Sequence, residues 1–171
     1  MASALKNLSQ YDDSTIPSAE DMRFGIVLSE WNQEITHALY KGCVETLEKH
    51  GAKVENIHTS QVPGAFELTV GAKLCIAKHK VDVVICIGCV IQGETKHNDY
   101  INHAVASGLA TLGMASSVPC IYGVLTPNTM EQAQDRAGGK YGNKGVEAAV
   151  SAIRMAELKK GATSTKSSIG F

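Results

Sequence analysis

The clearest chemical signal in this 171-residue sequence is a short polar stretch, Glu94, Thr95, Lys96 and His97, that follows a glycine. Before it, the unbroken apolar run Val83–Ile91 predicts a buried strand, and after it apolar residues recur at helical spacing. Backbone N–H groups of residues 94–96 would lack partners within the new helix, so they can bind an anion. His97 falls in the same turn, where an imidazole can move protons beside a phosphate. The stretch therefore predicts a phosphate cradle next to a proton-transfer group.

Other chemistries fit the sequence less well. His97 and His103 are six residues apart and fall on different faces of a helix, and no Cys/His grouping accompanies them, so we expect no metal site. Ser29 and Ser60 lack the GxSxG context of a nucleophilic serine. Neither a GxxxxGK[ST] loop nor a GxGxxG turn after the first strand is present. A first-turn histidine is also often a solvated or capping residue, so position alone leaves the role of His97 open.

The composition limits where in the cell the protein is expected and which partners it is expected to bind. A formal charge of -1 and a pI near 6.6 give no reason to expect nucleic acid or an anionic membrane as a partner. No secretion-type apolar segment opens the sequence, and no apolar run approaches the roughly 18 residues that span a bilayer. We therefore expect a soluble, cytoplasmic protein. Its cysteines are odd in number and lie in apolar surroundings, which favours reduced core thiols: Cys43, Cys75, Cys86, Cys89 and Cys120.

Four apolar segments that alternate with helical patterns supply the framework. The expected strands are Arg23–Leu28, Val54–Thr59, Val83–Ile91 and Val118–Leu125. This alternation predicts an α/β fold, a flavodoxin-like doubly wound four-stranded parallel sheet with helices on both faces. We expect an N-terminal arm over residues 1–20, a single domain over residues 21–160 and a flexible C-terminal tail over residues 161–171.

Polar or aromatic residues follow all four expected strands. In sheets of this class ligands bind beyond the carboxyl ends of the strands, and those ends carry Trp31, Gly64–Glu67, Gly93–His97 and Thr126. The single Trp is either a core-edge aromatic or a ring offered to a planar ligand, and its position does not decide between the two. Glu67 near the start of a helix fits a structural role, because the helix dipole favours a carboxylate there.

Three motifs in order resemble those of the lumazine synthase family. Val62–Glu67 reads VPGAFE, Gly93–Asp99 resembles the family's G-x-T-x-H-x-D turn, and Arg136–Gly145 resembles its RAGxKxGNKG loop. The resemblance runs from Arg23 to about Leu158. It implies condensation of 5-amino-6-(D-ribitylamino)uracil with 3,4-dihydroxy-2-butanone 4-phosphate to 6,7-dimethyl-8-ribityllumazine in riboflavin biosynthesis. The implied path is imine formation, loss of phosphate, ring closure and dehydration, without a metal or an organic cofactor.

The resemblance also assigns roles to residues. His97 matches the proton-transfer histidine and Arg136 the phosphate-binding arginine, whose planar, permanently charged group suits a phosphate dianion. Glu94 and Thr95 match positions that hold the phosphate, and we expect the Glu94 backbone N–H rather than its carboxylate to do so. The residues that match contacts to the pyrimidine ring and ribityl chain are Trp31, Asn32, Ala65, Phe66, Glu67, Cys89, Val90, Ile91, Tyr122 and Lys144, with Tyr122 expected from a neighbouring subunit.

The chain departs from the family pattern at the stacking aromatic, where Trp31 stands in place of the commoner Phe. Its larger face could strengthen stacking on tricyclic flavins by up to about 1 kcal/mol, so we expect detectable binding of riboflavin. The short loop over residues 138–145 resembles that of members whose pentamers close into icosahedral shells, so we expect a homo-oligomer of this kind. The alternatives are a non-catalytic flavin-binding or scaffold relative, against which His97 and Arg136 argue, and an enzyme with another substrate on the same fold.

Overall fold

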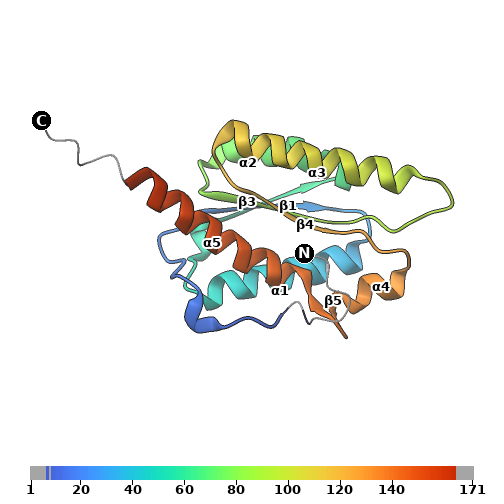
Figure 1. Ribbon diagram of the computed structural model, residues 1–171, viewed down its shortest axis with the longest axis horizontal. Helices are drawn as coiled ribbons and strands as arrows, with labels where there is room; N and C mark the ends of the chain where they lie inside the picture. Colours follow the sequence, from blue (N-terminus) through green and yellow to red (C-terminus); the bar gives the residue numbers. More distant parts are fainter. Residues whose placement is uncertain (1–6, 8, 165–171) are drawn as a thin grey trace, which may run out of the picture.

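A four-stranded, all-parallel sheet in the order β2-β1-β3-β4 forms the centre of the molecule (Figure 1). The computed structural model describes residue 7 and residues 9–164. The strands are β1 (Phe24–Ser29), β2 (Ile57–Val62), β3 (Val83–Cys89) and β4 (Cys120–Leu125). After pairing β1 with β2, the chain crosses to the other side of β1 and adds β3 and then β4. This is the order of a flavodoxin-like doubly wound sheet, as the sequence predicted.

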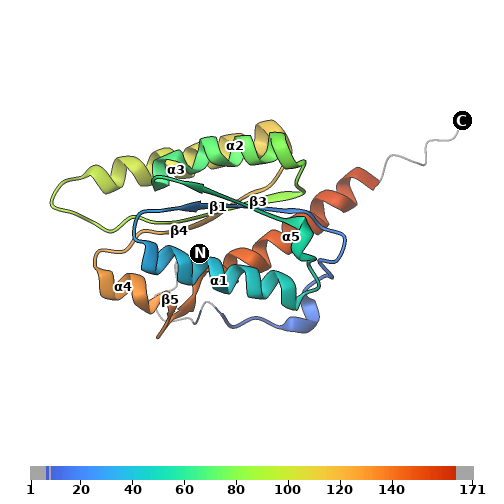
Figure 2. The same cartoon turned by 180° about the vertical axis from the view of Figure 1, so that it is seen from behind.

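Helices cover both faces of the sheet (Figures 1 and 2). On one face lie α2 (Leu68–His79) and α3 (His97–Ser116). On the other lie α1 (Gln33–Lys49), the short α4 (Met130–Asp135) and α5 (Lys144–Ser164). Between α4 and α5 the chain forms a small antiparallel hairpin of β5 (Ala137–Gly139) and β6 (Gly142–Asn143). Single 3-10 turns occupy Asp13–Thr15, Val54–Asn56 and Ala65–Glu67.

The two faces of the sheet build two separate hydrophobic cores. Every residue of β1 and β3 is buried, as expected for central parallel strands covered on both sides. Phe24, Ile26 and Ile85 pack with α1 and α5, whereas Val27 and Val84 pack with α2 and α3. Strands β2 and β4 stand at the edges and are only partly buried. The central pair β1 and β3 is therefore the most deeply buried part of the sheet.

Several predicted boundaries shift, among them the starts of β2 and α3 and the end of β3. Strand β2 begins at Ile57, because Val54–Asn56 turns as a 3-10 helix that leaves Val54 exposed. Strand β3 ends at Cys89, so the last two residues of the predicted strand lie beyond it. Helix α3 begins only at His97, where the carbonyl of Lys96 accepts the first helical N–H bonds, from Asp99 at 3.1 Å and Tyr100 at 3.4 Å. The predicted helical start three residues earlier is wrong, since residues 94–96 are exposed and gain no packing from a helix.

The described part of the N-terminal arm, residue 7 and residues 9–20, packs against its own chain, and the rest of the arm lies outside the described residues. Lys49 Nζ lies 2.8 Å from both carboxylate oxygens of Asp13, and the Ala19 N–H donates to the His50 carbonyl at 2.8 Å. Ala19 is fully buried in the core, although it lies within the stretch that the sequence assigned to an arm outside the core. At the other end, α5 continues to Ser164, into the span expected as a tail, and residues 165–171 lie outside the described part of the chain.

Candidate active site

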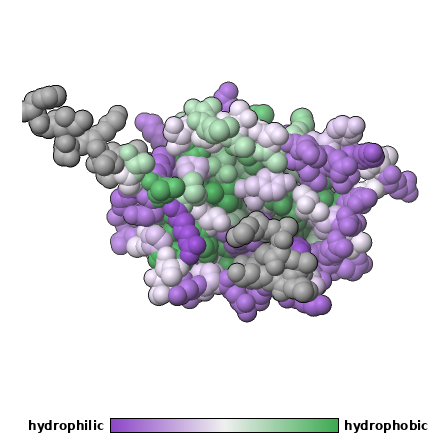
Figure 3. Space-filling view, in the orientation of Figure 1, coloured by the Kyte–Doolittle hydropathy of each residue, from purple (hydrophilic) through white to green (hydrophobic). Residues whose placement is uncertain are grey.

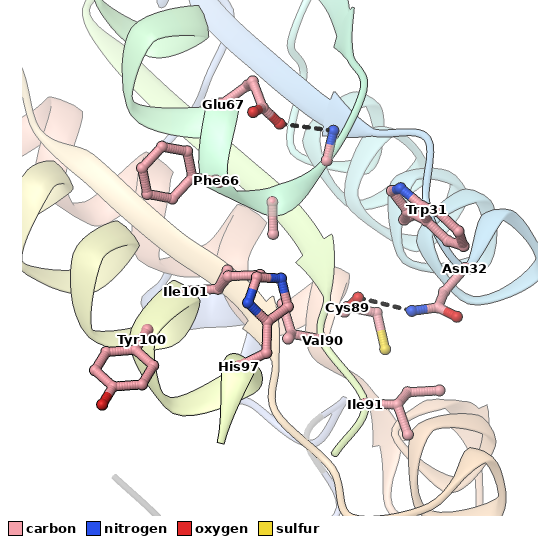
Figure 4. Close-up of a pocket in the computed structure, with 12 residues that line it drawn as sticks. Trp31, Asn32, Phe66, Glu67, Cys89, Val90, Ile91, His97, Tyr100 and Ile101 are labelled. Carbon is pink, nitrogen blue, oxygen red and sulfur yellow. Dashed lines mark hydrogen bonds between the residues drawn. The ribbon is translucent and has the colours of Figure 1, made fainter. Parts of the chain in front are cut away.

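A cavity of about 680 Å³ opens where the carboxyl ends of β1 and β3 lie side by side (Figure 4). Connections leave these two strands toward opposite sides of the sheet, so this is the switch point at which doubly wound folds bind ligands. The volume lies within the usual range for small-molecule sites. Its lining consists of Trp31, Asn32, Gly64, Ala65, Phe66, Glu67, Cys89, Val90, Ile91, His97, Tyr100 and Ile101.

The turn from β1 into α1 supplies one wall. The indole of Trp31 is 74% exposed, so it is not a core-edge aromatic but a ring presented at the cavity. Asn32 has left-handed backbone angles (φ 56°, ψ 49°), and its side-chain amide Nδ2 donates to the Cys89 carbonyl at 2.8 Å. This bond ties the end of β1 to the end of β3 beneath the ring, as the close-up shows (Figure 4).

The segment after β2 supplies the opposite wall. A carboxylate oxygen of Glu67 accepts the backbone N–H of Gly64 at 3.0 Å, which closes the 3-10 turn at the entrance to α2. Ala65 is buried and packs against the core, whereas the Phe66 ring is 60% exposed and is presented at the cavity. A Cβ at Gly88 would lie only 3.1 Å from Leu68 Cδ1, so this wall sits directly against β3. Glu67 thus has the structural role that its position suggested.

The chain beyond β3 forms the cavity floor. The N–H of Val90 donates to the Leu125 carbonyl at 2.8 Å, which holds the segment after its strand ends. Cys89 borders the cavity, but its side chain is buried in the core, and this burial raises the pKa of the thiol to about 12. The buried, protonated thiol that this environment favours does not suit a nucleophile, whose reactive form is the thiolate.

The first turn of α3 closes the remaining side. His97 is the first residue of that helix, and like Val90 and Ile101 it lines the cavity drawn in the close-up (Figure 4). Tyr100 and Ile101 also line the cavity, and sequence reasoning assigned neither of them to the site. Both could have been found, because residues three and four positions after His97 share its face of a helix.

Five of the sequence-predicted site residues do not line this cavity. Glu94 and Thr95 are exposed in the turn between β3 and α3. Tyr122 is half-buried in edge strand β4 against the core under α2 and α3, and that burial raises its pKa. Arg136 and Lys144 flank the β5–β6 hairpin, where the Lys144 N–H donates to the Arg136 carbonyl at 2.9 Å. The cavity therefore gathers His97 and eight of the ten residues that the family resemblance assigned to the pyrimidine ring and ribityl chain, but not Arg136, which the resemblance assigned to the phosphate.

The cysteines pack as free thiols rather than forming disulfides. All five cysteines are free thiols, four of them buried and Cys120 partly so, which confirms the predicted core thiols. Among the described residues, no three His, Cys, Asp or Glu side chains converge as metal ligands would. Nor does the described chain contain a helix with the length and apolar character to cross a membrane.

Comparison with known proteins gives a single family. The family model described as 6,7-dimethyl-8-ribityllumazine synthase matches residues 21–160. A protein of that name from Phocaeicola vulgatus is 54% identical over 159 residues, which cover 93% of this chain and 95% of the relative. One from Parabacteroides distasonis is 52% identical over 155 residues (91% and 97%), and one from Bacteroides fragilis is 56% identical over 137 residues (80% and 96%).

Proposed function

The chain belongs to the 6,7-dimethyl-8-ribityllumazine synthase family, and we propose that the cavity between β1 and β3 is where it forms the lumazine ring. The protein is a transferase of riboflavin biosynthesis that condenses 5-amino-6-(D-ribitylamino)uracil with 3,4-dihydroxy-2-butanone 4-phosphate and releases phosphate and water. The observation that carries the placement is the convergence of Trp31, Asn32 and His97 on one cavity at the switch point of the sheet. A non-catalytic flavin-binding or scaffold role is not favoured by this family membership.

His97 is the catalytic residue of the proposal. Imine formation, loss of phosphate, ring closure and dehydration each require a proton to be moved, and none requires a metal or an organic cofactor. An imidazole at the cavity edge can give and take protons in successive steps. Its place at the first residue of α3 holds its backbone at the cavity edge, and its exposed side chain can meet the substrate.

The pyrimidine would lie against the Trp31 indole, which is already presented to the cavity. Because the Cys89 carbonyl and the Val90 N–H already have partners in the fold, we assign the ring-edge contacts to the Val90 carbonyl and the Ile91 N–H. Ala65, Phe66 and Glu67 would flank the ribityl chain. The same stacking surface would bind riboflavin, whose isoalloxazine is larger than the pyrimidine.

Arg136 would bind the phosphate of the second substrate, together with the backbone N–H groups of Glu94 and Thr95. These two residues precede α3 rather than opening it, so they would contribute as turn amides beside the helix N-terminus. The exposed Glu94 carboxylate would turn toward solvent, away from the phosphate.

A neighbouring subunit would complete the site. Tyr122, Arg136 and Lys144 lie outside the single-chain cavity, so we propose that they reach it from a second copy. Large apolar side chains stay exposed on α2 and α3, among them Val70, Leu74 and Met114, and Figure 3 shows hydrophobic residues gathered where these helices lie. Burial of this surface between copies would build pentamers, which we propose assemble further into an icosahedral shell in the cytoplasm.

The direct test of this function is lumazine formation by the purified protein. Mixed with the ribitylaminouracil and the butanone phosphate, the protein is expected to form the fluorescent product well above the uncatalysed rate. A rate equal to the uncatalysed one, with flavin still bound, would instead support the non-catalytic alternative. Sedimentation of the same sample would test the assembly, and a particle no larger than a pentamer would overturn the proposed shell.

A further inference from the structure

The β5–β6 hairpin holds the backbone of Arg136, but its backbone hydrogen bonds do not fix the Arg136 side chain. Ala137 pairs with Asn143, and the Arg136 carbonyl accepts the Lys144 N–H at 2.9 Å. The Asn143 side chain then anchors the hairpin: Nδ2 donates to the Ala38 carbonyl of α1 at 3.0 Å, and Oδ1 accepts the Gly145 N–H at 2.7 Å. The Cα of Arg136 is therefore fixed, whereas several rotatable bonds separate it from the guanidinium.

One side chain of the same hairpin contacts that guanidinium. Arg136 Cζ lies 5.5 Å from the centre of the Tyr141 ring, within the range of a cation–π interaction. The Tyr141 N–H donates to the Asp135 carbonyl at 2.8 Å, so the ring itself starts from a fixed backbone. Lys140 Nζ lies 5.2 Å from the same ring centre, so two cations share this aromatic.

An aromatic ring holds a cation in a way that suits a ligand-binding arginine. Over residue 7 and residues 9–164, no carboxylate forms a salt bridge with Arg136. A carboxylate partner would accept hydrogen bonds from the guanidinium N–H groups and compete directly with an incoming phosphate, whereas an aromatic ring is not a carboxylate and does not form such bidentate bonds. Tyr141 therefore limits the rotamers of the Arg136 side chain without competing with phosphate for its N–H groups.

We propose that Tyr141 is a positioning residue that holds the Arg136 guanidinium ready for the phosphate of the substrate. The proposal rests on the phosphate-binding role proposed for Arg136. Its effect is a lower entropy cost when the anion binds, since fewer rotamers of Arg136 remain to be frozen. It concerns affinity for the phosphorylated substrate and not the proton transfers.

The test compares Tyr141→Leu with Tyr141→Phe in the full assembled protein, using inorganic phosphate as the probe in calorimetric titrations. Tyr141→Leu is expected to raise the Kd of phosphate and the KM of the butanone phosphate by about two- to fivefold, the range that corresponds to a partly exposed cation–π contact. Tyr141→Phe keeps the ring and is expected to keep the wild-type affinity. The KM of the pyrimidine, which a general loss of structure would also raise, is expected to stay the same in both variants.

Tyr11 offers a matched control. Its ring also lies under a lysine, with Lys49 Nζ 5.4 Å from the ring centre, but on the N-terminal arm. Tyr11→Leu is expected to leave the Kd of phosphate unchanged. Wild-type phosphate affinity in Tyr141→Leu, while Arg136→Ala weakens binding, would overturn the role of Tyr141 alone. Unchanged affinity in Arg136→Ala would overturn the phosphate-binding role of the arginine, and the inference with it.

Discussion

The side-chain amide of Asn32 donates a hydrogen bond of 2.8 Å to the carbonyl of Cys89, and this bond joins the ends of β1 and β3 beneath the proposed substrate ring. The two residues are 57 positions apart in the sequence. Asn32 can reach Cys89 because it turns the chain from strand to helix with left-handed backbone angles that Asn tolerates better than most residues. Asn32 thus forms both the turn that presents Trp31 at the cavity and the hydrogen bond that holds the strand ends below the indole.

Replacement of Asn32 should separate these two contributions. Asn32→Gly keeps the left-handed turn and loses only the hydrogen bond, which we expect to cost about 1 kcal/mol of stability. Asn32→Ala loses the bond and strains the turn, at a further cost of about 1 kcal/mol. Urea unfolding measures the three stabilities, which are expected to decrease in the order wild type, Asn32→Gly, Asn32→Ala. Equal stabilities for all three proteins would show that neither the hydrogen bond nor the turn contributes to stability. The KM of the pyrimidine substrate is expected to rise in both variants.

Trp31 should contribute measurably to the affinity for riboflavin. Trp31→Ala removes the stacking surface and is expected to weaken binding by about fivefold, or about 1 kcal/mol, while Trp31→Phe falls between the two. Titration of riboflavin with each protein, followed by flavin fluorescence, gives the three affinities. An unquenched flavin with the wild-type protein would rule out the binding itself, and equal quenching by Trp31→Ala would place the flavin elsewhere.

Mixed assemblies should reveal whether the site spans two chains. His97→Ala and Arg136→Ala are each expected to be nearly inactive. If a site takes His97 from one subunit and Arg136 from its neighbour, unfolding and refolding the two variants together in equal amounts gives some sites with both residues intact. Random mixing predicts recovery of about a quarter of the wild-type activity. No recovery in mixed particles of normal size would mean that both residues serve the same chain's site.

A stacked histidine pair at the sheet edge should make stability depend on pH. The rings of His58 and His79 lie 4.3 Å apart with 13° between their planes, and His58 Nε2 is buried without a hydrogen-bond partner among the described residues. Burial lowers the pKa of His58 below its ordinary 6.5, and the positive charges of His79, Arg23 and Lys78 lower it further. The unfolded chain therefore binds a proton more readily than the folded protein.

Stability is thus expected to fall as the pH drops below about 6.5, where unfolded His58 becomes protonated, and to level off below the folded-state pKa. His58→Phe removes the titrating group and should flatten the dependence of the unfolding free energy on pH. His37→Gln, a change on the exposed surface of α1, is the control and should leave the slope as in the wild type. An unchanged slope in His58→Phe would contradict the assignment.

The sequence predicted the parts of the fold that depend on local pattern. Strands β1 and β3 were found because a parallel strand covered on both faces is apolar throughout. The start of β2 was misplaced because Val54, exposed in a 3-10 turn, extends the apparent alternation of the strand. The start of α3 was misplaced for a related reason: apolar spacing shows where a helix packs, but not where it begins.

The same distinction applies to the site. His97 and Trp31 could be assigned to it because both follow strands whose carboxyl ends must meet in a parallel sheet. The link from Asn32 to Cys89 and the ring of Tyr141 beside Arg136 could not, because they depend on side-chain directions that the spacing of residues does not determine. Tyr141 occupies an unspecified position of the RAGxKxGNKG pattern, so the pattern carried no signal for its role.

The central claim is that His97 transfers protons during formation of the lumazine ring, and the kcat of His97→Ala tests it most directly. With both substrates saturating, we expect kcat to fall by about two to four orders of magnitude, as for the loss of a general acid–base group, while riboflavin binding at Trp31 persists. A kcat within a factor of about three of the wild type, with the assembly intact, would contradict the claim and move the proton transfers to another group or to solvent.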